Sequence, residues 1–146
     1  MGVLTYIDTS MLVKRYVPEV GAQALEQRLL GELPTLIISE LVRVEFVSSL
    51  RRMERKGLID RDFGNAALAY FLDDIAQARI KVLPLNPICL ERAASLIAQL
   101  KSPLATLDGL HLATALIHRA AHFFTTDLQL SRAALEAGLI VWPELD

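Results

Sequence analysis

Short apolar, β-rich runs recur along the chain, and each is followed by a segment whose apolar residues repeat at three- and four-residue steps. The runs are typical of buried strands and the segments of amphipathic helices. The predicted strands cover residues 3–7, 35–38, 80–84, 122–125 and 139–141. Because strands alternate with helices, the sequence predicts an α/β fold with a parallel sheet of about five strands, covered by helices on both faces.

The helical segments begin and end at residues with the expected chemistry. Pro18-Glu19 is expected to open one helix, Ser39 caps a long one, and Gly57 and Gly138 are predicted stops. The predicted helices are a short turn through 15, then 18–30, 39–56, 60–75, 87–100, 106–117 and 128–137. Core residues are expected at Val42, Phe46, Leu50 and Met53, and the helix after Pro87 carries Leu90, Ala94, Ile97 and Leu100.

Length and composition indicate one domain over residues 1–146, long enough to bury a core without disulfides. The chain is 53% hydrophobic, yet it lacks the uninterrupted apolar run of about 18 residues that a membrane span needs. Its first residues do not resemble a secretion signal, so we expect a cytoplasmic protein without membrane attachment. The single cysteine, Cys89, is expected to fill the core, and the high apolar content hints at an oligomer.

The net charge of −2 provides no global basic field for nucleic acid. A local patch is possible on the helix from Ser39, because Glu45, Arg52 and Lys56 fall on one face of it. This face has an acid at its inner end and bases further along. It is either a solvated face with internal ion pairs or a surface where Arg52 and Lys56 bind an RNA backbone.

Two acids occupy equivalent positions at the ends of predicted strands. Asp8 follows the first strand, and Asp127 follows the fourth in the same way. Ligands of open α/β sheets bind at the carboxyl ends of the strands, so both acids are candidate site residues. The simpler alternative for Asp8 is that it caps the next helix, because Asp is a preferred N-cap residue.

Two further acids are predicted to lie near the same edge. Asp108 is in the first turn of a helix that is apolar or small on almost every side, so it is expected to be partly buried and to need a partner or the helix dipole. Glu45 borders the core stripe of its helix. Four acids gathered at one edge would repel one another unless a hard divalent cation such as Mg²⁺ bound there.

Other titratable residues fit structural roles better. His111 lies three residues after Asp108, where it is either a packed, hydrogen-bonded residue or a general base, and packing is favoured. Asp73 and Asp74 are neighbours on a predicted helix, so their side chains point in different directions. Such a pair indicates a solvated face rather than a metal site.

Taken together, four segments resemble the PIN-domain ribonucleases, in particular the VapC-type toxins of toxin-antitoxin pairs. The likeness extends over nearly the whole chain in order and spacing, and the segment from Asp108 to Ala115 is its most specific part. The four segments are Tyr6-Ile7-Asp8-Thr9-Ser10, the helical Glu45, Leu107-Asp108-Gly109-Leu110-His111-Leu112-Ala113-Thr114-Ala115 and Phe124-Thr125-Thr126-Asp127.

The resemblance implies a three-layer fold and a metal-dependent endoribonuclease. Mg²⁺ or Mn²⁺ would be held by Asp8, Glu45, Asp108 and Asp127, and the Thr125 hydroxyl would support the site. The implied partners are an RNA substrate, a second copy in a homodimer, and a VapB-type antitoxin that reaches into the acidic site. From Gly109 to Thr126 the chain has no further acid, so Asp127 is the only acid that the resemblance assigns to the site after Asp108.

Two other functions fit the residues alone. Asp8 could be the nucleophile of a metal-dependent phosphatase, although Ser10 stands where haloacid-dehalogenase-type sites have a second acid. Alternatively, the acids of a non-catalytic PIN-like domain could bind a basic peptide of a protein partner. Metal-dependent turnover that is lost on neutralising the acids would exclude the binding domain.

Overall fold

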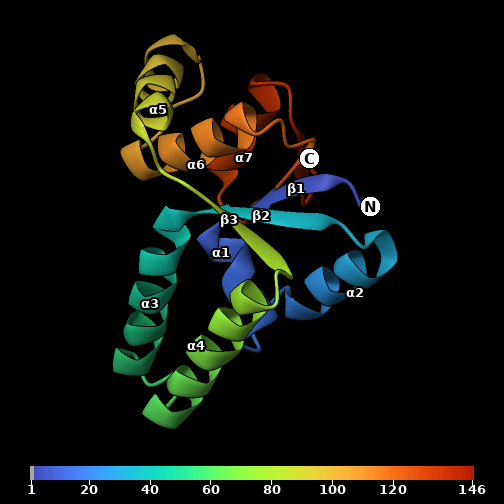
Figure 1. The fold of residues 1–146 in the computed structure, drawn as a ribbon, viewed down its shortest axis with the longest axis vertical. Coiled ribbons are helices and arrows are strands. Elements are labelled where there is room, and N and C mark those ends of the chain that lie inside the picture. Colours follow the sequence, from blue (N-terminus) through green and yellow to red (C-terminus); the bar gives the residue numbers. More distant parts are fainter. Residues whose placement is uncertain (1) are drawn as a thin grey trace.

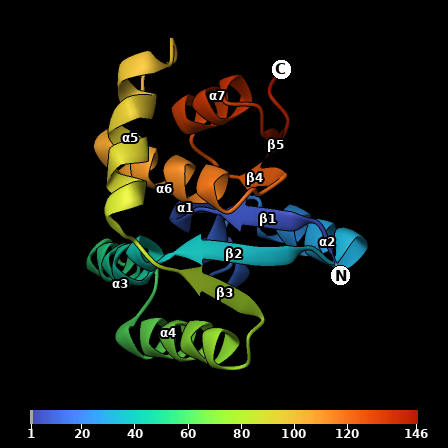
Figure 2. The same cartoon turned by 45° about the horizontal axis from the view of Figure 1, so that its top comes forward.

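The computed structural model describes residues 2–146, so Met1 of the predicted domain lies outside the described residues. Five parallel strands form one sheet in the order β3-β2-β1-β4-β5 (Figures 1 and 2). The strands are β1 (Leu4–Ile7), β2 (Thr35–Ser39), β3 (Ile80–Leu83), β4 (His122–Phe124) and β5 (Ile140–Trp142). The predicted α/β class and the parallel five-stranded sheet are confirmed.

Helices cover both faces of the sheet and make three layers. One face carries α1, η1, α2, α3 and α4, and the other carries α5, α6 and α7 (Figure 1). The helices are α1 (Thr9–Leu12), η1 (Val13–Arg15), α2 (Ala22–Glu32), α3 (Glu40–Arg55), α4 (Arg61–Ala76), α5 (Pro87–Gln99), α6 (Thr106–Ile117) and α7 (Leu128–Glu136).

Side chains alternate along the central strand and divide the core into two clusters. Tyr6 points to the layer of α5, α6 and α7, where it packs with Phe123 of β4. Ile7 points to the opposite layer, where Phe46 of α3 and Phe71 of α4 lie 4.2 Å apart between ring centroids. This alternation follows from the two-residue period of a strand. Because both faces are buried, the strand is mostly apolar before Asp8, and its one small polar residue, Thr5, donates its hydroxyl proton to the Val3 carbonyl.

The order in which the chain adds strands to the sheet reverses at β1. The chain first builds β2 and β3 on one side of β1, and it then returns to add β4 and β5 on the other side. In open parallel sheets this switch point leaves a crevice at the carboxyl ends of the two strands concerned. The crevice between β1 and β4 is therefore where a site is expected, and Asp8 and Thr125 follow those two strands directly.

Two helices differ from the sequence prediction. The helix expected to open at Pro18 begins at Ala22, because Gly21 in front of it adopts a left-handed backbone (φ +92°). Residues before Gly21 form a turn. Helix α5 buries Cys89, Ala93 and Leu96, which confirms Cys89 as a core residue but shifts the buried face by one position from the predicted apolar set.

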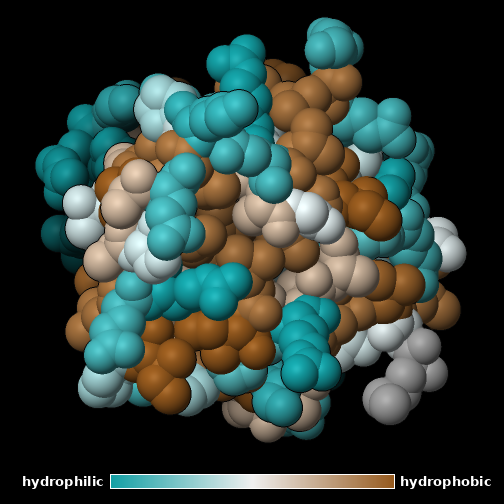
Figure 3. Space-filling model, turned by 90° about the horizontal axis from the view of Figure 1, so that it is seen from above, coloured by the Kyte–Doolittle hydropathy of each residue, from teal (hydrophilic) through white to brown (hydrophobic). Residues whose placement is uncertain are grey.

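The shift leaves apolar side chains on the outside of α5. Leu90 and Ile97 are 54% and 41% exposed. The face that carries the upper layer shows broad apolar areas between hydrophilic side chains (Figure 3). Part of the high apolar content is thus on the surface rather than in the core. Within residues 2–146, no helix is both long and apolar enough to cross a membrane.

Candidate active site

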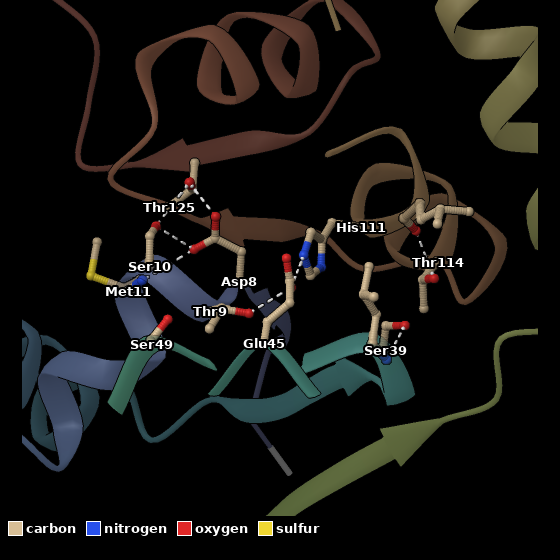
Figure 4. Close-up of polar contacts among 12 residues, drawn as sticks. Asp8, Thr9, Ser10, Met11, Ser39, Glu45, Ser49, His111, Thr114 and Thr125 are labelled. Carbon is tan, nitrogen blue, oxygen red and sulfur yellow. Dashed lines mark hydrogen bonds and ion pairs between the residues drawn. The ribbon is translucent and has the colours of Figure 1, made fainter. Parts of the chain in front are cut away.

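Asp8 lies at the centre of the sheet edge, and three neighbours hold its side chain by hydrogen bonds. Its side chain is 4% exposed and caps α1, with Oδ1 accepting from the Met11 amide at 3.1 Å and from the Ser10 hydroxyl at 2.8 Å. Oδ2 accepts from the Thr125 hydroxyl at 2.6 Å (Figure 4). Burial raises the pKa of Asp8, and these hydrogen bonds oppose that effect. Asp8 is therefore both the N-cap of α1 and a member of the candidate site.

Thr125 connects Asp8 to Asp127. Besides donating to Asp8, its hydroxyl oxygen accepts from the Asp127 amide at 3.0 Å. Asp127 is exposed and caps α7, because its Oδ1 accepts from the Leu130 amide. Ser10 adds a second link between the two loops, accepting from the Thr126 amide at 3.1 Å. The two strand ends are thus bound to each other by hydroxyl groups.

Glu45 reaches the same crevice from α3. Its Oε1 accepts from the Thr9 hydroxyl at 2.8 Å and pairs with His111 Nε2 at 2.6 Å. Burial raises the pKa of Glu45, but the hydrogen bonds from His111 and Thr9 and the attraction of His111 outweigh burial and leave the pKa below its ordinary value. Figure 4 shows the Glu45 carboxylate between these two residues. Glu45 is therefore a carboxylate at neutral pH.

His111 is buried and both of its ring nitrogens have hydrogen-bond partners, as expected for a packed residue. It is 2% exposed on α6, and its Nδ1 pairs with the Tyr6 hydroxyl on β1. The sequence prediction of a packed, hydrogen-bonded histidine is confirmed. Tyr6 was not among the expected site residues, because nothing near it in sequence indicates a partner 105 positions away.

Asp108 completes the acidic group from the first turn of α6. It is half-buried, as predicted, and no hydrogen bond shown within residues 2–146 ends on its carboxylate. Burial, followed by the negative charge of Asp127, raises the pKa of Asp108 to about 6, and Asp8 and Glu45 add to the rise. Asp108 therefore lies within electrostatic range of Asp127, Asp8 and Glu45.

The oxygen atoms that remain free suit a hard cation. A carboxylate oxygen has two lone pairs. Both are used on Asp8 Oδ1 and Glu45 Oε1, whereas Asp8 Oδ2 accepts one hydrogen bond and Glu45 Oε2 none within residues 2–146. Asp108 and the second oxygen of Asp127 are free as well. An oxygen-only donor set of this kind fits Mg²⁺ or Mn²⁺.

The four acids do not yet form a closed set of ligands. Among the described residues, no group of three or more His, Cys, Asp or Glu side chains already surrounds a metal position. Asp8 and Glu45 are fixed by hydrogen bonds, while Asp127 is exposed and Asp108 is half-exposed without a partner. The fit is therefore one of donor chemistry, with two fixed and two adjustable carboxylates.

The two predicted bases lie along α3 away from the acids. Arg52 and Lys56 are exposed, and Arg52 donates to the Ser49 hydroxyl at 3.2 Å. The helical rise of 1.5 Å per residue places them about 10 and 17 Å along the axis from Glu45. The structure therefore keeps them on one helix with the site but does not bring them into it.

A groove of about 1120 Å³ lies in the layer of helices α1 to α4, between η1, α2 and α4. None of the four acids is among the residues that line it. Several of its charges are paired with one another: Asp74 binds Arg15, Arg79 and the Tyr16 hydroxyl. Asp74 is therefore a partly buried member of an ion-pair network rather than part of a fully solvated face, whereas Asp73 is exposed as predicted.

One supporting residue outside the crevice was not expected from the sequence. Glu136, in the last turn of α7, accepts from the amides of Lys101 and Ser102 at 2.8 and 2.9 Å, and also from the Ser102 hydroxyl. These bonds anchor the loop that leads into α6, where Asp108 lies. No local pattern could have identified them, because the contact joins residues 34 and 35 positions apart.

Comparisons with known proteins agree with this arrangement. The family model described as PIN domain matches residues 5–136. No curated protein matches the sequence. VapC20 of Mycobacterium tuberculosis, described as a Sarcin-Ricin loop cleaving toxin, superposes with a TM-score of 0.69 at 15% identity, over 93% of this chain and 96% of that chain.

Two structures of complexes are similar as well. FitAcB from Neisseria gonorrhoeae gives a TM-score of 0.68 at 19% identity, over 94% of this chain and 95% of that one. VapBC2 from Rickettsia felis, bound to a DNA fragment from its promoter, gives 0.67 at 15% identity, over 95% and 97%. At such identities the likeness is one of fold. With the family model covering most of the sequence, and with the sheet, both helical layers and the acidic edge in place, the chain belongs to the PIN domain family.

Proposed function

We propose that this protein is a metal-dependent endoribonuclease that hydrolyses RNA phosphodiester bonds, and that it is the toxin of a type II toxin-antitoxin system. One observation carries the proposal. Asp108 experiences the negative charges of Asp127, Asp8 and Glu45 near the switch point of a PIN-domain sheet, and within residues 2–146 none of these four acids pairs with a lysine or arginine. Uncompensated acids of this kind are costly to a fold, so their placement favours a cationic ligand.

Asp8, Glu45, Asp108 and Asp127 are the residues that would hold Mg²⁺ or Mn²⁺. When bound, such a cation supplies a water activated for attack and stabilises charge on the phosphoryl group. The chain provides the rest. Thr125 and Ser10 orient Asp8, and Thr9 and His111 orient Glu45. Asp108, whose pKa is raised to about 6, would serve as a ligand in its deprotonated form.

Arg52 and Lys56 are proposed to bind the RNA backbone. Both are exposed on the helix that carries Glu45. Their distance along α3 suits phosphates flanking the scissile bond rather than the scissile phosphate itself. Their contribution is expected to weaken as salt rises, because it is electrostatic.

The proposed partners are a VapB-type antitoxin and a second copy of the chain. In support, the similar structures include a toxin-antitoxin complex from Klebsiella pneumoniae, with a TM-score of 0.60 at 20% identity. An acidic crevice without basic neighbours would accept a basic side chain from an inhibitor. We propose that the protein acts in the cytoplasm as a single domain over residues 1–146.

The nucleophile of a phosphatase is a less suitable role for Asp8. A nucleophilic carboxylate must present a free oxygen to phosphorus. Both oxygens of Asp8 already accept hydrogen bonds, and the side chain is 4% exposed. This environment fits a fixed ligand better than an attacking group.

The test is cleavage of mixed cellular RNA by the purified protein in Mg²⁺, Mn²⁺ or EDTA, with the cleaved ends mapped. We expect discrete cuts that need metal and that disappear in Asp8→Asn. The matched control is Asp62→Asn, which neutralises an exposed acid of α4 outside the site and should leave cleavage intact. Absence of cleavage and of metal binding by calorimetry would contradict the proposal and favour a non-catalytic protein-binding domain.

A further inference from the structure

A chain of hydrogen bonds crosses the buried centre of the molecule and ends on Glu45. The Ser39 amide donates to the Tyr6 hydroxyl at 3.2 Å, that hydroxyl pairs with His111 Nδ1, and His111 Nε2 pairs with Glu45. These residues come from four elements: β2, β1, α6 and α3. The chain of contacts therefore links both layers of helices through the sheet.

The direction of each hydrogen bond follows from the first donor. Because the Tyr6 oxygen accepts from the Ser39 amide, its own proton is free to point to His111 Nδ1. Burial raises the pKa of Tyr6 well above 10, so the phenol keeps that proton. His111 must then accept at Nδ1 and donate from Nε2. One tautomer is selected, and it directs an N–H at Glu45 Oε1.

The ring of Tyr6 cannot easily turn away from this role. It is fully buried, it stacks on Phe123 with ring centroids 5.1 Å apart and an interplanar angle of 11°, and it meets the His111 ring edge-on at 5.8 Å. His111 is 2% exposed on a helix packed against the sheet. Two rigid rings thus define where the N–H of His111 lies.

We propose that Tyr6 and His111 are positioning residues for the acidic site: together they occupy Glu45 Oε1 and leave Oε2 facing the crevice as a ligand oxygen. This inference rests on the proposed function, because it assigns the relay a purpose in cation binding. Thr9 donates to the same Oε1 and completes its lone pairs. A glutamate has three side-chain torsions, and without these donors it would sample many positions.

The alternative is that the two residues only fill the core. Simple packing would be served better by Phe and Leu, because buried polar groups cost free energy unless every one is paired. A general base is also excluded as the role of His111, since both ring nitrogens are engaged inside the protein. The polar pair is explained by what it does to Glu45.

The experiment measures binding of Mn²⁺ alone by calorimetry, together with melting temperature. We expect His111→Ala to weaken Mn²⁺ binding about 10-fold or more, as the loss of such supporting partners commonly does. His111→Gln should recover much of the affinity, because its amide can donate to Glu45. Tyr6→Phe, which changes only the hydroxyl, should weaken binding by a smaller factor.

A matched control removes a different buried polar group from the same helix. Thr114 lies three residues after His111 on α6, is fully buried, and donates to the Leu110 carbonyl at 2.8 Å. Thr114→Val should lower the melting temperature without changing Mn²⁺ affinity. An affinity loss of the same size in Thr114→Val would show that the His111 effect is general to the helix and would overturn the inference.

A second readout is independent of metal. The ¹⁵N spectrum of the His111 imidazole should show a protonated Nε2 and an unprotonated Nδ1, and a protonated Nδ1 facing the Tyr6 hydroxyl would contradict the assigned direction of the chain. Unchanged Mn²⁺ affinity in His111→Ala, with binding and RNA cleavage intact in the wild type, would overturn this inference alone. Failure of the wild type to bind Mn²⁺ or to cleave RNA would overturn the proposed function as well.

Discussion

At the scale of single residues, each acid of the site is tolerated by a different physical means. Asp8 is surrounded by hydroxyl and amide donors, Glu45 is paired with an imidazole, and Asp108 keeps a proton more tightly than a free aspartate. Asp127 remains exposed and uses one oxygen as a helix cap. Within residues 2–146 the four acids therefore have no lysine or arginine partner, and the free-energy cost of placing each one differs.

Removing the Thr125 hydroxyl should test how much Asp8 depends on it. Thr125→Val keeps the shape but takes away the donor to Asp8 and the acceptor for the Asp127 amide. We expect a loss of about 1–3 kcal/mol in the free energy of unfolding, because buried polar groups lose their partner. Urea denaturation measures it. Thr126→Val, at the exposed neighbouring position, is the control and should change stability little; an equal loss there would refute the explanation.

Neutralising Asp108 should stabilise the metal-free protein in a pH-dependent way. Since the folded-state pKa is raised to about 6 from 3.8, the folded state binds the proton more tightly than the unfolded state. Ionisation of Asp108 therefore lowers the free energy of unfolding as pH rises from 3.8 to about 6, and the whole of this loss is present above pH 6. Asp108→Asn should therefore unfold at higher urea than the wild type at pH 8 in EDTA, with the difference vanishing near pH 4.

The control for this experiment is Asp62→Asn, which removes an exposed acid of α4. A gain of the same size and pH dependence in that variant would show that net charge, and not the site, is responsible. A pH-independent gain in Asp108→Asn would likewise contradict the assigned cause.

The sequence led to the acids, and the family resemblance led to the Thr125 hydroxyl that donates to Asp8, but neither led to the residues that hold Glu45. Asp8 and Asp127 follow apolar strands, and Asp108 opens an apolar helix, so local patterns place them near one edge. The partners of His111 come from β1 and α3, 105 and 66 positions away. No periodicity encodes such pairs. A buried tyrosine two residues before the first acid was the only available signal.

At the scale of elements, prediction was best where one face of an element is unambiguous. Helix α3 buries Val42, Phe46 and Leu50 as expected, because charged and polar residues occupy most of its other positions, with Val44 and Val47 as exposed exceptions. Helix α5 has apolar residues on more than one side, so spacing alone could not tell Ala93 and Leu96 from the exposed Leu90. Tertiary packing on α6 makes that choice.

Two glycines should respond oppositely to alanine. Gly31 lies in α2, and an added Cβ would meet no atom within 4 Å, so Gly31→Ala should stabilise the protein by about 0.5–1 kcal/mol. Gly57 ends α3 with φ +72°, where its amide donates to the Glu54 carbonyl. Gly57→Ala should cost about 1 kcal/mol or more. Thermal denaturation of both variants measures this, and effects of the same sign would contradict it.

At the scale of the whole molecule, ligand binding and stability are linked. If Mg²⁺ or Mn²⁺ binds only the folded state, it adds about 2.7 kcal/mol to the free energy of unfolding at 100 times its Kd. We expect the melting temperature to rise with Mn²⁺ and to return on adding EDTA. The rise should be lost in Asp8→Asn and kept in Asp62→Asn. A rise that persists without Asp8 would place the cation elsewhere.

The central position of β1 also governs when the protein becomes competent during its synthesis. β1 is translated first, yet one of its two neighbours, β4, begins 115 residues after β1 ends. The hydroxyl of Thr125 and the carboxylate of Asp127 follow that late strand. A nascent chain therefore cannot assemble the acidic crevice until the segment through Asp127 has left the ribosome, and long-range pairing of this kind slows folding further. The topology itself acts as a delay between translation and activity.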